Sequence, residues 1–425
     1  MKKNDLPLEC DTWLASHGFV PNPFPSNATR AETDKVLQND ETAFVRVPNY
    51  GSIRGTLDDP GAHFIFAESG GGKTTVREEI KRYYDGLLGM KNNPQVLSVI
   101  YKNFEDLPTG DLNEDDYQQI LYRAHVERII AAILLRLFDV WGDKRQSACI
   151  RGIKHKRIKK QLQWYLTKFL NLFPWQFKKL QKSARMRSYL PLLHYLIRVL
   201  LGALSSLVPA TGPLATALGD IPTYKNYSKL EGKFIAVELL SELISLCKEI
   251  GYSGVYVLID NLELGYSEEK KYEKGFYRIA PLFWNLDIYD ISGMIIKIFI
   301  PQGMEPFYKQ KVRQTRILPV KMEWTRDLIR DVYKRRLRSC WKVGEDAAEP
   351  SLEVLCDLSL RDKIDQFMIE YGCSKKTPQA LIEIGVRLLD EHFYTTERFS
   401  DELISLEAWE RATYKAMGSK GEEVL

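Results

Sequence analysis

A glycine-rich stretch near residue 70 carries the residue types and spacing with the most evident chemistry. Four apolar residues at 64–67 run into an acidic residue, a serine, three glycines, a lysine and two threonines, and a helical pattern follows at 76–88. Glycines let backbone N–H groups close around phosphate oxygens, and the N-terminus of a helix adds partial positive charge. We therefore predict a strand, a phosphate-binding loop and a helix, with ligand contacts from Ala67, Glu68, Ser69, Gly70, Gly71, Gly72, Lys73, Thr74 and Thr75.

Two side chains of this loop have distinct expected roles. Lys73 would reach the β- and γ-phosphates of a nucleoside triphosphate such as ATP, and the Thr74 hydroxyl would hold Mg²⁺. The usual pattern begins with glycine six residues before the lysine, whereas this chain has Ala67 there. The alternative is a glycine-rich turn that binds nothing, but the strand and helix on either side favour a nucleotide site.

Three polar residues further along the chain complete the predicted site. Asp260 ends an apolar run, where its carboxylate would hold Mg²⁺ together with Thr74. Glu263 is the candidate base that polarises an attacking water, and Gln302, directly after another apolar run, is the candidate sensor of the γ-phosphate. Each has a structural alternative: a helix-capping aspartate, a solvated loop acid and a loop amide. With Lys73 they form the predicted catalytic set, because all would converge on one loop.

The apolar runs and their spacing predict an α/β fold. Strands are expected at 64–67, 95–101, 254–260, 294–301 and 316–324, with helical patterns between them. Strands separated by helices form a parallel, doubly wound sheet, here of about five strands. Ligands of such sheets bind at the carboxyl ends of the strands, where the phosphate loop, Asp260 and Gln302 would all lie.

Composition divides the chain into three expected parts. These are an N-terminal arm at 1–60, a core at 61–325 with a helical insertion at 142–232, and a C-terminal helical lid or winged-helix-like domain at 326–425. Three prolines between residues 21 and 25 exclude a regular element there. This segment either packs as a rigid arm on the core or lies over the base of the nucleotide. The basic run 334–338 is interpreted as the solvated face of a helix.

The insertion has a one-sided charge. Between residues 144 and 219 there are 15 Lys and Arg and no Asp or Glu, while the rest of the chain carries 45 basic and 56 acidic residues. Basic residues interleaved with aromatics at 144–187 suit contacts to nucleic acid; the alternatives are a protein-docking surface and a solvated helix face. The uncharged run 199–219 is long enough to suggest a membrane contact. Pro209, Gly212 and Pro213 interrupt this run, however, and favour a buried helical hairpin.

Cysteine usage and the N-terminal residues indicate a cytoplasmic protein. The six cysteines form no CxxC pair, so we expect reduced thiols rather than disulfides or a metal site. The six histidines lack metal-ligand spacing, which argues against zinc. The first residues lack the apolar core of a signal peptide.

The order of these features resembles the P-loop ATPases of the AAA+ and STAND superclass. The segment Gly-Phe-x-x-Asn-Pro-Phe at 18–24 is similar to one that precedes the phosphate loop in bacterial ATPases of the general-secretion and transposition groups. Residues 377–385 are similar to the lid helix of origin-recognition-type ATPases. The resemblance covers residues 18–110 and 235–395, and it implies a P-loop NTPase core that uses the residues named above with ATP and Mg²⁺.

The chain departs from this pattern in the lid and after the strand-end aspartate. The lid arginine that contacts the γ-phosphate in that family is Gln379 here; the contact is either absent or made by Lys375, Lys376 or Arg387. Asn261, rather than glutamate, follows Asp260, and the spacing to Glu263 is closer to the STAND pattern. A trans-acting arginine finger in a homo-oligomer would come from Arg313 or Arg316, between the last two strands.

Two kinds of function follow from the resemblance and the charge pattern. The first is an ATP-hydrolysing conformational switch or assembly ATPase, in DNA transactions or bacterial defence. The alternative is a nucleotide-regulated module that binds nucleic acid or a membrane through the insertion and turns over little ATP.

Overall fold

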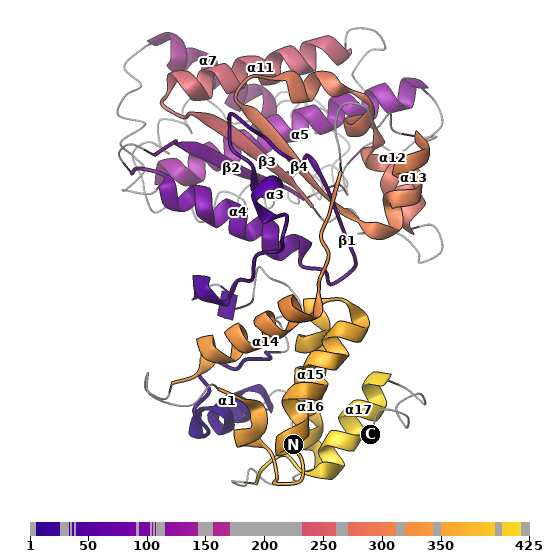
Figure 1. Ribbon diagram of the computed structural model, residues 1–425. Helices are drawn as coiled ribbons and strands as arrows, with labels where there is room; N and C mark the ends of the chain where they lie inside the picture. The colour runs from indigo at the N-terminus through magenta and orange to yellow at the C-terminus, as the bar shows by residue number, and fades with distance from the viewer. Residues whose placement is uncertain are drawn as a thin grey trace, which may run out of the picture.

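The computed structural model describes ten longer segments of the chain and a few isolated positions. These are residues 6–25, 34, 36–37, 40–90, 93–102, 104, 107, 115–142, 156–170, 232–260, 271–311, 319–342, 350–395 and 402–417. The described residues form a sheet lobe and a smaller helical lobe joined near residue 324, as Figure 1 shows.

Five strands form one all-parallel sheet, in agreement with the predicted α/β class. They are β1 (Phe64–Ala67), β2 (Val96–Tyr101), β3 (Gly254–Ile259), β4 (Met294–Pro301) and β5 (Val320–Lys321), in the order β2-β3-β4-β1-β5. The first four lie within two residues of their predicted bounds, because continuous apolar runs mark strands buried on both faces. The strand β5 is shorter than the predicted strand 316–324. Residues 319 and 322–324 are described and lie outside the strand, so the prediction is wrong for them, while 316–318 lie outside the described residues.

Helices cover both faces of the sheet, which makes it doubly wound. Phe64 and Phe66 join the core formed with α5 (Asp115–Gly142), α7 (Lys156–Leu170), α11 (Gly232–Glu249) and α12 (Lys271–Trp284). Ile65 and Ala67 face the opposite way, onto α3 (Tyr50–Arg54) and α4 (Lys73–Leu87). The short elements η6 (Leu286–Asp290), η7 (Gln302–Met304) and α13 (Glu305–Lys311) flank β4. This alternation follows from the two-residue period of a strand.

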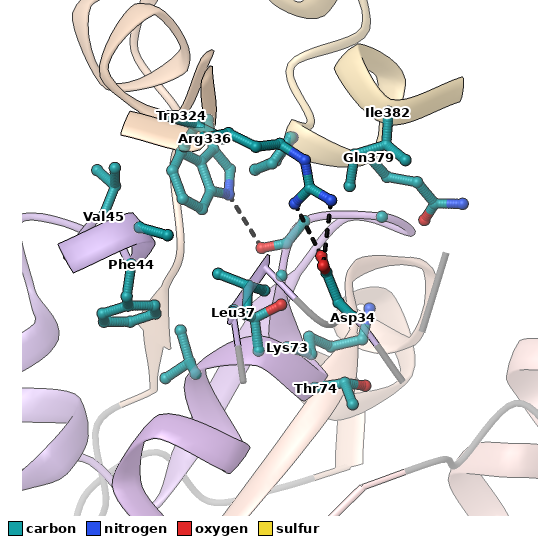
Figure 2. A pocket seen from close by; sticks show the side chains of 18 residues that line it. Asp34, Leu37, Phe44, Val45, Lys73, Thr74, Trp324, Arg336, Gln379 and Ile382 are labelled. Atoms are coloured by element: carbon teal, nitrogen blue, oxygen red, sulfur yellow. Dashed lines mark hydrogen bonds and ion pairs between the residues drawn. The ribbon is translucent and has the colours of Figure 1, made fainter. Parts of the chain in front are cut away.

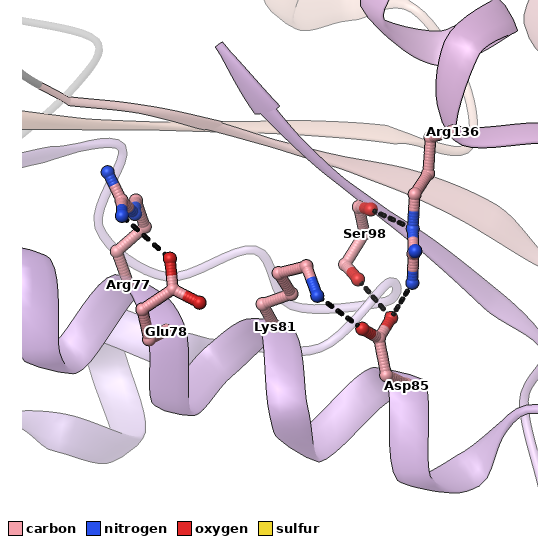
Figure 3. Close-up of polar contacts among 6 residues, drawn as sticks. All are labelled: Arg77, Glu78, Lys81, Asp85, Ser98 and Arg136. Carbon is pink, nitrogen blue, oxygen red and sulfur yellow. Dashed lines mark hydrogen bonds and ion pairs between the residues drawn. The ribbon is translucent and has the colours of Figure 1, made fainter. Parts of the chain in front are cut away.

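A polar network fixes the far end of α4 to the edge of the sheet (Figure 3). The Asp85 carboxylate accepts hydrogen bonds from Lys81 (2.7 Å), from the Ser98 hydroxyl on β2 (2.6 Å) and from Arg136 on α5 (2.6 Å). The same Arg136 guanidinium also donates to the Ser98 carbonyl at 3.1 Å. Three elements therefore share one carboxylate, which holds the helix that starts at the glycine-rich loop.

The structure describes one helix of the predicted insertion. In α7, Ile158, Leu162 and Tyr165 are buried in the core of the sheet lobe, so α7 is part of this lobe. The uncharged run 199–219 lies outside the described residues. Among the helices that the structure does describe, none is both long and apolar enough to cross a membrane.

The helical lobe joins the two ends of the described chain. It contains α1 (Leu6–Ser16), η1 (Glu41–Ala43), α14 (Arg326–Cys340), η8 (Leu352–Leu355), α15 (Arg361–Lys375), α16 (Pro378–Thr395) and α17 (Leu406–Met417) (Figure 1). The proline-rich segment packs here: the rings of Phe19 and Trp341 lie 4.8 Å apart, and Gly385 leaves room for Phe24, because an added Cβ would lie 2.3 Å from that ring. This segment therefore rests on the helical lobe and not over the pocket described below.

The cysteines within the described residues are free thiols, as expected. Cys10, Cys247, Cys340 and Cys356 are buried and Cys373 is half-buried. Burial raises the pKa of the Cys247 thiol to about 12, so it stays protonated at neutral pH.

Candidate functional site

The predicted phosphate loop lies between the carboxyl end of β1 and the start of α4. Gly70 and Gly72 have left-handed backbone conformations, with φ of 73° and 80°, which glycine adopts without strain. The Gly71 N–H donates to the Glu68 carbonyl at 3.0 Å and closes the turn. Ala67 is the buried last residue of β1, whereas Glu68 and Ser69 are exposed. The loop thus leads directly to a helix N-terminus, where the helix dipole favours anions.

Lys73, the first residue of α4, folds back across this loop. Its Nζ donates to the carbonyl oxygens of Ala67 (3.2 Å) and Glu68 (3.0 Å). The side chain is half-buried, so the ammonium is held by the loop while part of it still meets solvent. A cation in this position can exchange carbonyl oxygens for those of an anion that enters the loop.

Thr74 and Asp260 meet although 186 residues separate them in the chain. The Thr74 hydroxyl donates to Oδ2 of Asp260 at 2.8 Å, and Asp260 follows directly after β3. A hydroxyl and a carboxylate are the hard oxygen ligands that Mg²⁺ prefers, so this pair suits a magnesium ion bound with a phosphate. The geometry brings together the two residues predicted to hold the metal.

Arg77 completes this cluster and was not identified from the sequence. Its guanidinium donates to Oδ2 of Asp260 at 2.9 Å. It also donates to Glu78 at 2.6 Å, as Figure 3 shows. The side chains of Arg77 and Asp260 are 0% and 3% exposed. The signal in the sequence is an arginine beside Val76 and three residues before Ile80, on the face of α4 that the apolar pattern buries.

The remaining predicted site residues are only partly placed. Gln302 is the half-buried first residue of η7 and follows Pro301, the register partner of Ala67, so it lies beside the start of the glycine-rich loop. Glu263, Asn261 and the finger candidates at 313 and 316 lie outside the described residues.

A pocket opens over the glycine-rich loop, between the two lobes (Figure 2). Three parts of the chain line it, and most of its apolar side chains come from the N-terminal segment and the helical lobe. The lining residues are Asp34, Leu37, Ala43, Phe44, Val45, 70–76, Trp324, Val332, Arg336, Pro378, Gln379 and Ile382. The N-terminal contribution therefore comes from residues 34–45 and not from the proline-rich segment.

The helical lobe contacts the loop through two side chains. The Trp324 indole N–H donates to the Gly71 carbonyl at 2.9 Å. Gln379 lies against Gly70, where an added Cβ would be 2.7 Å from its Oε1, and its amide donates to Glu383 at 2.7 Å. Arg387, a candidate for the missing lid arginine, instead donates to the Lys415 carbonyl on α17. Among the described lining residues, Gln379 is thus the polar group that α16 brings to the loop.

A buried ion pair between the N-terminal segment and α14 forms one wall of the pocket. Arg336 donates to both carboxylate oxygens of Asp34, at 2.7 and 3.1 Å, and also to the Pro23 carbonyl. The prediction of a solvated basic face at 334–338 is wrong for this residue, whose side chain is 5% exposed. Lys334, Arg335 and Arg338 are exposed as predicted. Arg336 differs because Asp34 comes from a segment 302 residues away, which no local pattern reveals.

These features define an α/β protein with a parallel five-stranded sheet, a glycine-rich loop at its carboxyl edge and a helical lobe closing over that loop. Comparison with protein-family models, with curated proteins and with solved structures finds no significant match.

Proposed function

We propose that this chain is a P-loop NTPase that binds ATP with Mg²⁺ in the pocket of Figure 2 and hydrolyses it as a conformational switch. The observation that carries the proposal is the 2.8 Å hydrogen bond between Thr74 and Asp260 beneath the start of α4. It joins a loop hydroxyl to a strand-end carboxylate at the edge of the sheet where ligands of parallel sheets bind. In this proposal the pair, beside a helix N-terminus, supplies oxygen ligands for a metal that binds with the phosphates.

The residues of the loop have separate roles in this proposal. Gly70 and Gly72 give the backbone the conformation with which its N–H groups surround phosphate oxygens. Lys73 exchanges the carbonyls of Ala67 and Glu68 for the β- and γ-phosphate oxygens. Magnesium, held from Thr74 and Asp260, would neutralise charge on the phosphates when bound.

The strand order supports the remaining catalytic assignments. Because β4 lies between β1 and β3, Gln302 at the end of β4 sits between the phosphate loop and Asp260. It is therefore well placed to sense a γ-phosphate. Glu263, three residues after Asp260, is the proposed base that orients the attacking water.

The switch is proposed to work through the contacts of the helical lobe with the loop. Trp324 and Gln379 reach Gly71 and Gly70, so a phosphate entering the loop changes the surface against which both side chains pack. Binding would then bias the lobe toward one orientation, and hydrolysis would release it. The apolar side chains of Leu37, Phe44, Val45, Val332 and Ile382 offer the base a dry surface between the lobes.

The direct test is the nucleotide affinity of a Lys73→Ala variant. We expect it to lose ATP binding, while Lys73→Arg binds weakly without turnover because a planar guanidinium replaces a compact ammonium. Isothermal titration of Mg²⁺–ATP measures the affinity, and Lys274→Ala, at an exposed position on α12 outside the pocket, is the control. Unchanged affinity in Lys73→Ala would refute the site.

Glu263→Gln should keep ATP binding and lose about 10²-fold in turnover, as removal of a general base commonly does.

A second candidate function, nucleic-acid binding, is favoured by the exposed face of α7. Trp164 is 46% exposed there, and the Lys168 ammonium lies 4.6 Å from the centre of its ring. Lys160, one turn before Trp164, is also exposed. An aromatic platform flanked by ammonium groups suits stacking of a base with phosphates on either side.

The test of this second candidate is the salt dependence of binding to single-stranded DNA or RNA. Changing Lys160 and Lys168 to Gln should lower the slope of log affinity against log salt by about 1.4, which corresponds to two phosphate contacts. Trp164→Ala should weaken binding without changing that slope, and Lys274→Gln on α12 serves as the control. Binding to anionic vesicles but not to nucleic acid would overturn this candidate.

A further inference from the structure

The cluster around Asp260 contains a positive charge, that of Arg77, which binding of a phosphate and a metal would not require. The Arg77 guanidinium lies 2.9 Å from the oxygen that also accepts the Thr74 hydroxyl, and both charged side chains are buried. Arginine remains charged at every accessible pH. A full positive charge therefore already sits beside the carboxylate that is proposed to face Mg²⁺.

Packing alone does not explain an arginine at this position. Val76, Ile80 and Tyr84 already bury the sheet-facing side of α4. The network at Asp85 fixes the other end of the helix to β2 and α5. A buried ion pair is costly to form compared with an apolar contact of the same size. An apolar side chain at position 77 would thus be expected if anchoring the helix were its only task.

We propose that Arg77 is a positioning residue that acts as the resident counter-ion of Asp260: it holds the carboxylate in place and keeps the site from taking up Mg²⁺ without nucleotide. The inference rests on the proposed function, since it concerns the same site. Arg77 is shared between Asp260 at 2.9 Å and Glu78 at 2.6 Å, so it offsets the charge of Asp260 in part. A free Mg²⁺ ion therefore meets less negative charge at Asp260 than it would at an uncompensated carboxylate. The phosphates of ATP supply the missing charge, so the metal enters together with the nucleotide.

The charge of Arg77, and not its shape, is what this inference concerns. Arg77→Gln removes the charge but keeps an N–H group that can donate to Asp260, whereas Arg77→Lys keeps the charge. A unit positive charge beside a carboxylate commonly lowers its affinity for another cation by about tenfold or more. The glutamine variant should therefore bind free Mg²⁺ at least about tenfold more tightly than the unmodified chain.

The experiment measures the effect of Mg²⁺ on melting temperature without nucleotide, and then the Mg²⁺ dependence of binding of a non-hydrolysable ATP analogue. Free Mg²⁺ should raise the melting temperature of Arg77→Gln, and hardly that of the unmodified chain or of Arg77→Lys. Arg82→Gln, whose guanidinium pairs with Glu79 at 3.0 Å on the same helix, is the matched control. Na⁺ at equal ionic strength controls for screening. Adding Asp260→Asn to Arg77→Gln should abolish the response to Mg²⁺.

Several results would overturn the inference. One is an Arg77→Gln variant that responds to Mg²⁺ as the unmodified chain does, and another is an Arg77→Lys variant that responds as strongly as Arg77→Gln. A glutamine variant that stays unfolded even with saturating Mg²⁺ would show that the pair is purely structural. The ATP analogue tests the proposed function separately: if the unmodified chain never binds it, while Arg77→Gln still gains a response to Mg²⁺, the counter-ion role stands and the nucleotide assignment fails.

Discussion

Lys297 places an ammonium group in the middle of the otherwise apolar strand β4. It shares a face of the sheet with Ile295 and Phe299, and its side chain is fully buried. Its Nζ donates to the Ala62 carbonyl at 2.6 Å and to the Pro60 carbonyl, which ties the segment before β1 to the centre of the sheet. Burial lowers the pKa of Lys297 from 10.5 to about 7, and nearby Asp59 only partly offsets this effect.

The lowered pKa of Lys297 predicts a specific pH dependence of stability. Above pH 7 the folded chain has lost this proton, whereas the unfolded chain keeps it until about pH 10.5, so unfolding takes up a proton. The free energy of unfolding should therefore rise with pH, by about 1 kcal/mol between pH 6 and pH 8 from this group. Chemical denaturation at both pH values measures the rise.

The contribution of Lys297 is isolated by comparison with a Lys297→Met variant. Other groups, including His125 and His392, whose pKa values burial lowers, also titrate below neutral pH in both proteins. The difference in free energy of unfolding between the unmodified chain and Lys297→Met should grow by about 1 kcal/mol over this interval. Lys309→Met, which changes a largely exposed lysine, should show no such growth. A constant difference for Lys297→Met would mean that the buried ammonium titrates normally.

At the scale of elements, the sequence is informative wherever burial is continuous. β2, β3 and β4 were predicted nearly to the residue, because runs such as Gly254–Ile259 are apolar throughout and bounded by polar residues. The placement of Asp260 at the end of β3 followed directly, as did its meeting with Thr74. The sequence does not reveal which buried positions are charged: Arg77 and Lys297 lie on faces that the apolar pattern assigns to the core, and each is held by a partner far away in the chain.

The connection between β5 and α14 joins the lobes at the loop. Trp324 packs against the core behind α4 and also against the helical lobe, while its N–H group reaches Gly71. We predict that Trp324→Phe, which keeps an aromatic ring but removes the donor, weakens Mg²⁺–ATP binding about fivefold. This corresponds to the net worth of one hydrogen bond, about 1 kcal/mol. Binding of a fluorescent ATP analogue measures the effect.

A matched substitution separates the effect of losing the hydrogen bond from Trp324 to Gly71 from the effect of replacing any tryptophan by phenylalanine. Trp284, at the end of α12, is 38% exposed and is not among the residues that line the pocket. Trp284→Phe should leave nucleotide affinity unchanged. Equal affinities for the unmodified chain and Trp324→Phe would show that the bond to Gly71 does not prepare the loop for nucleotide.

At the scale of the whole molecule, the N-terminal segment belongs to the helical lobe. Trp13, Phe19 and Phe24 are buried in one hydrophobic cluster with α14, α15 and α16, separate from the two clusters that flank the sheet. The sequence left open whether this arm packs on the core or covers the base. It could not decide the question, because the answer depends on contacts between residues about three hundred positions apart, such as Asp34 and Arg336.

The ion pair between Asp34 and Arg336 should be the strongest single interaction between the N-terminal segment and helix α14. Both side chains are buried, at 1% and 5% exposure, and three hydrogen bonds of Arg336 go to the N-terminal segment. Removing one partner leaves the other charge buried without compensation, which costs about 3–5 kcal/mol. We therefore expect Asp34→Leu and Arg336→Met each to lower the free energy of unfolding by about that amount.

The double variant decides whether this cost comes from the pair. Two apolar side chains leave no uncompensated charge, so Asp34→Leu with Arg336→Met should be more stable than either single variant, although the Pro23 carbonyl still loses its donor. Arg338→Met, two residues along α14 and exposed, should change stability by no more than about 0.5 kcal/mol. Urea unfolding of the unmodified chain, the two single variants and the double variant gives the coupling free energy directly. If the changes in free energy of unfolding of the two single variants simply added, the N-terminal segment would be held to α14 by the apolar cluster alone.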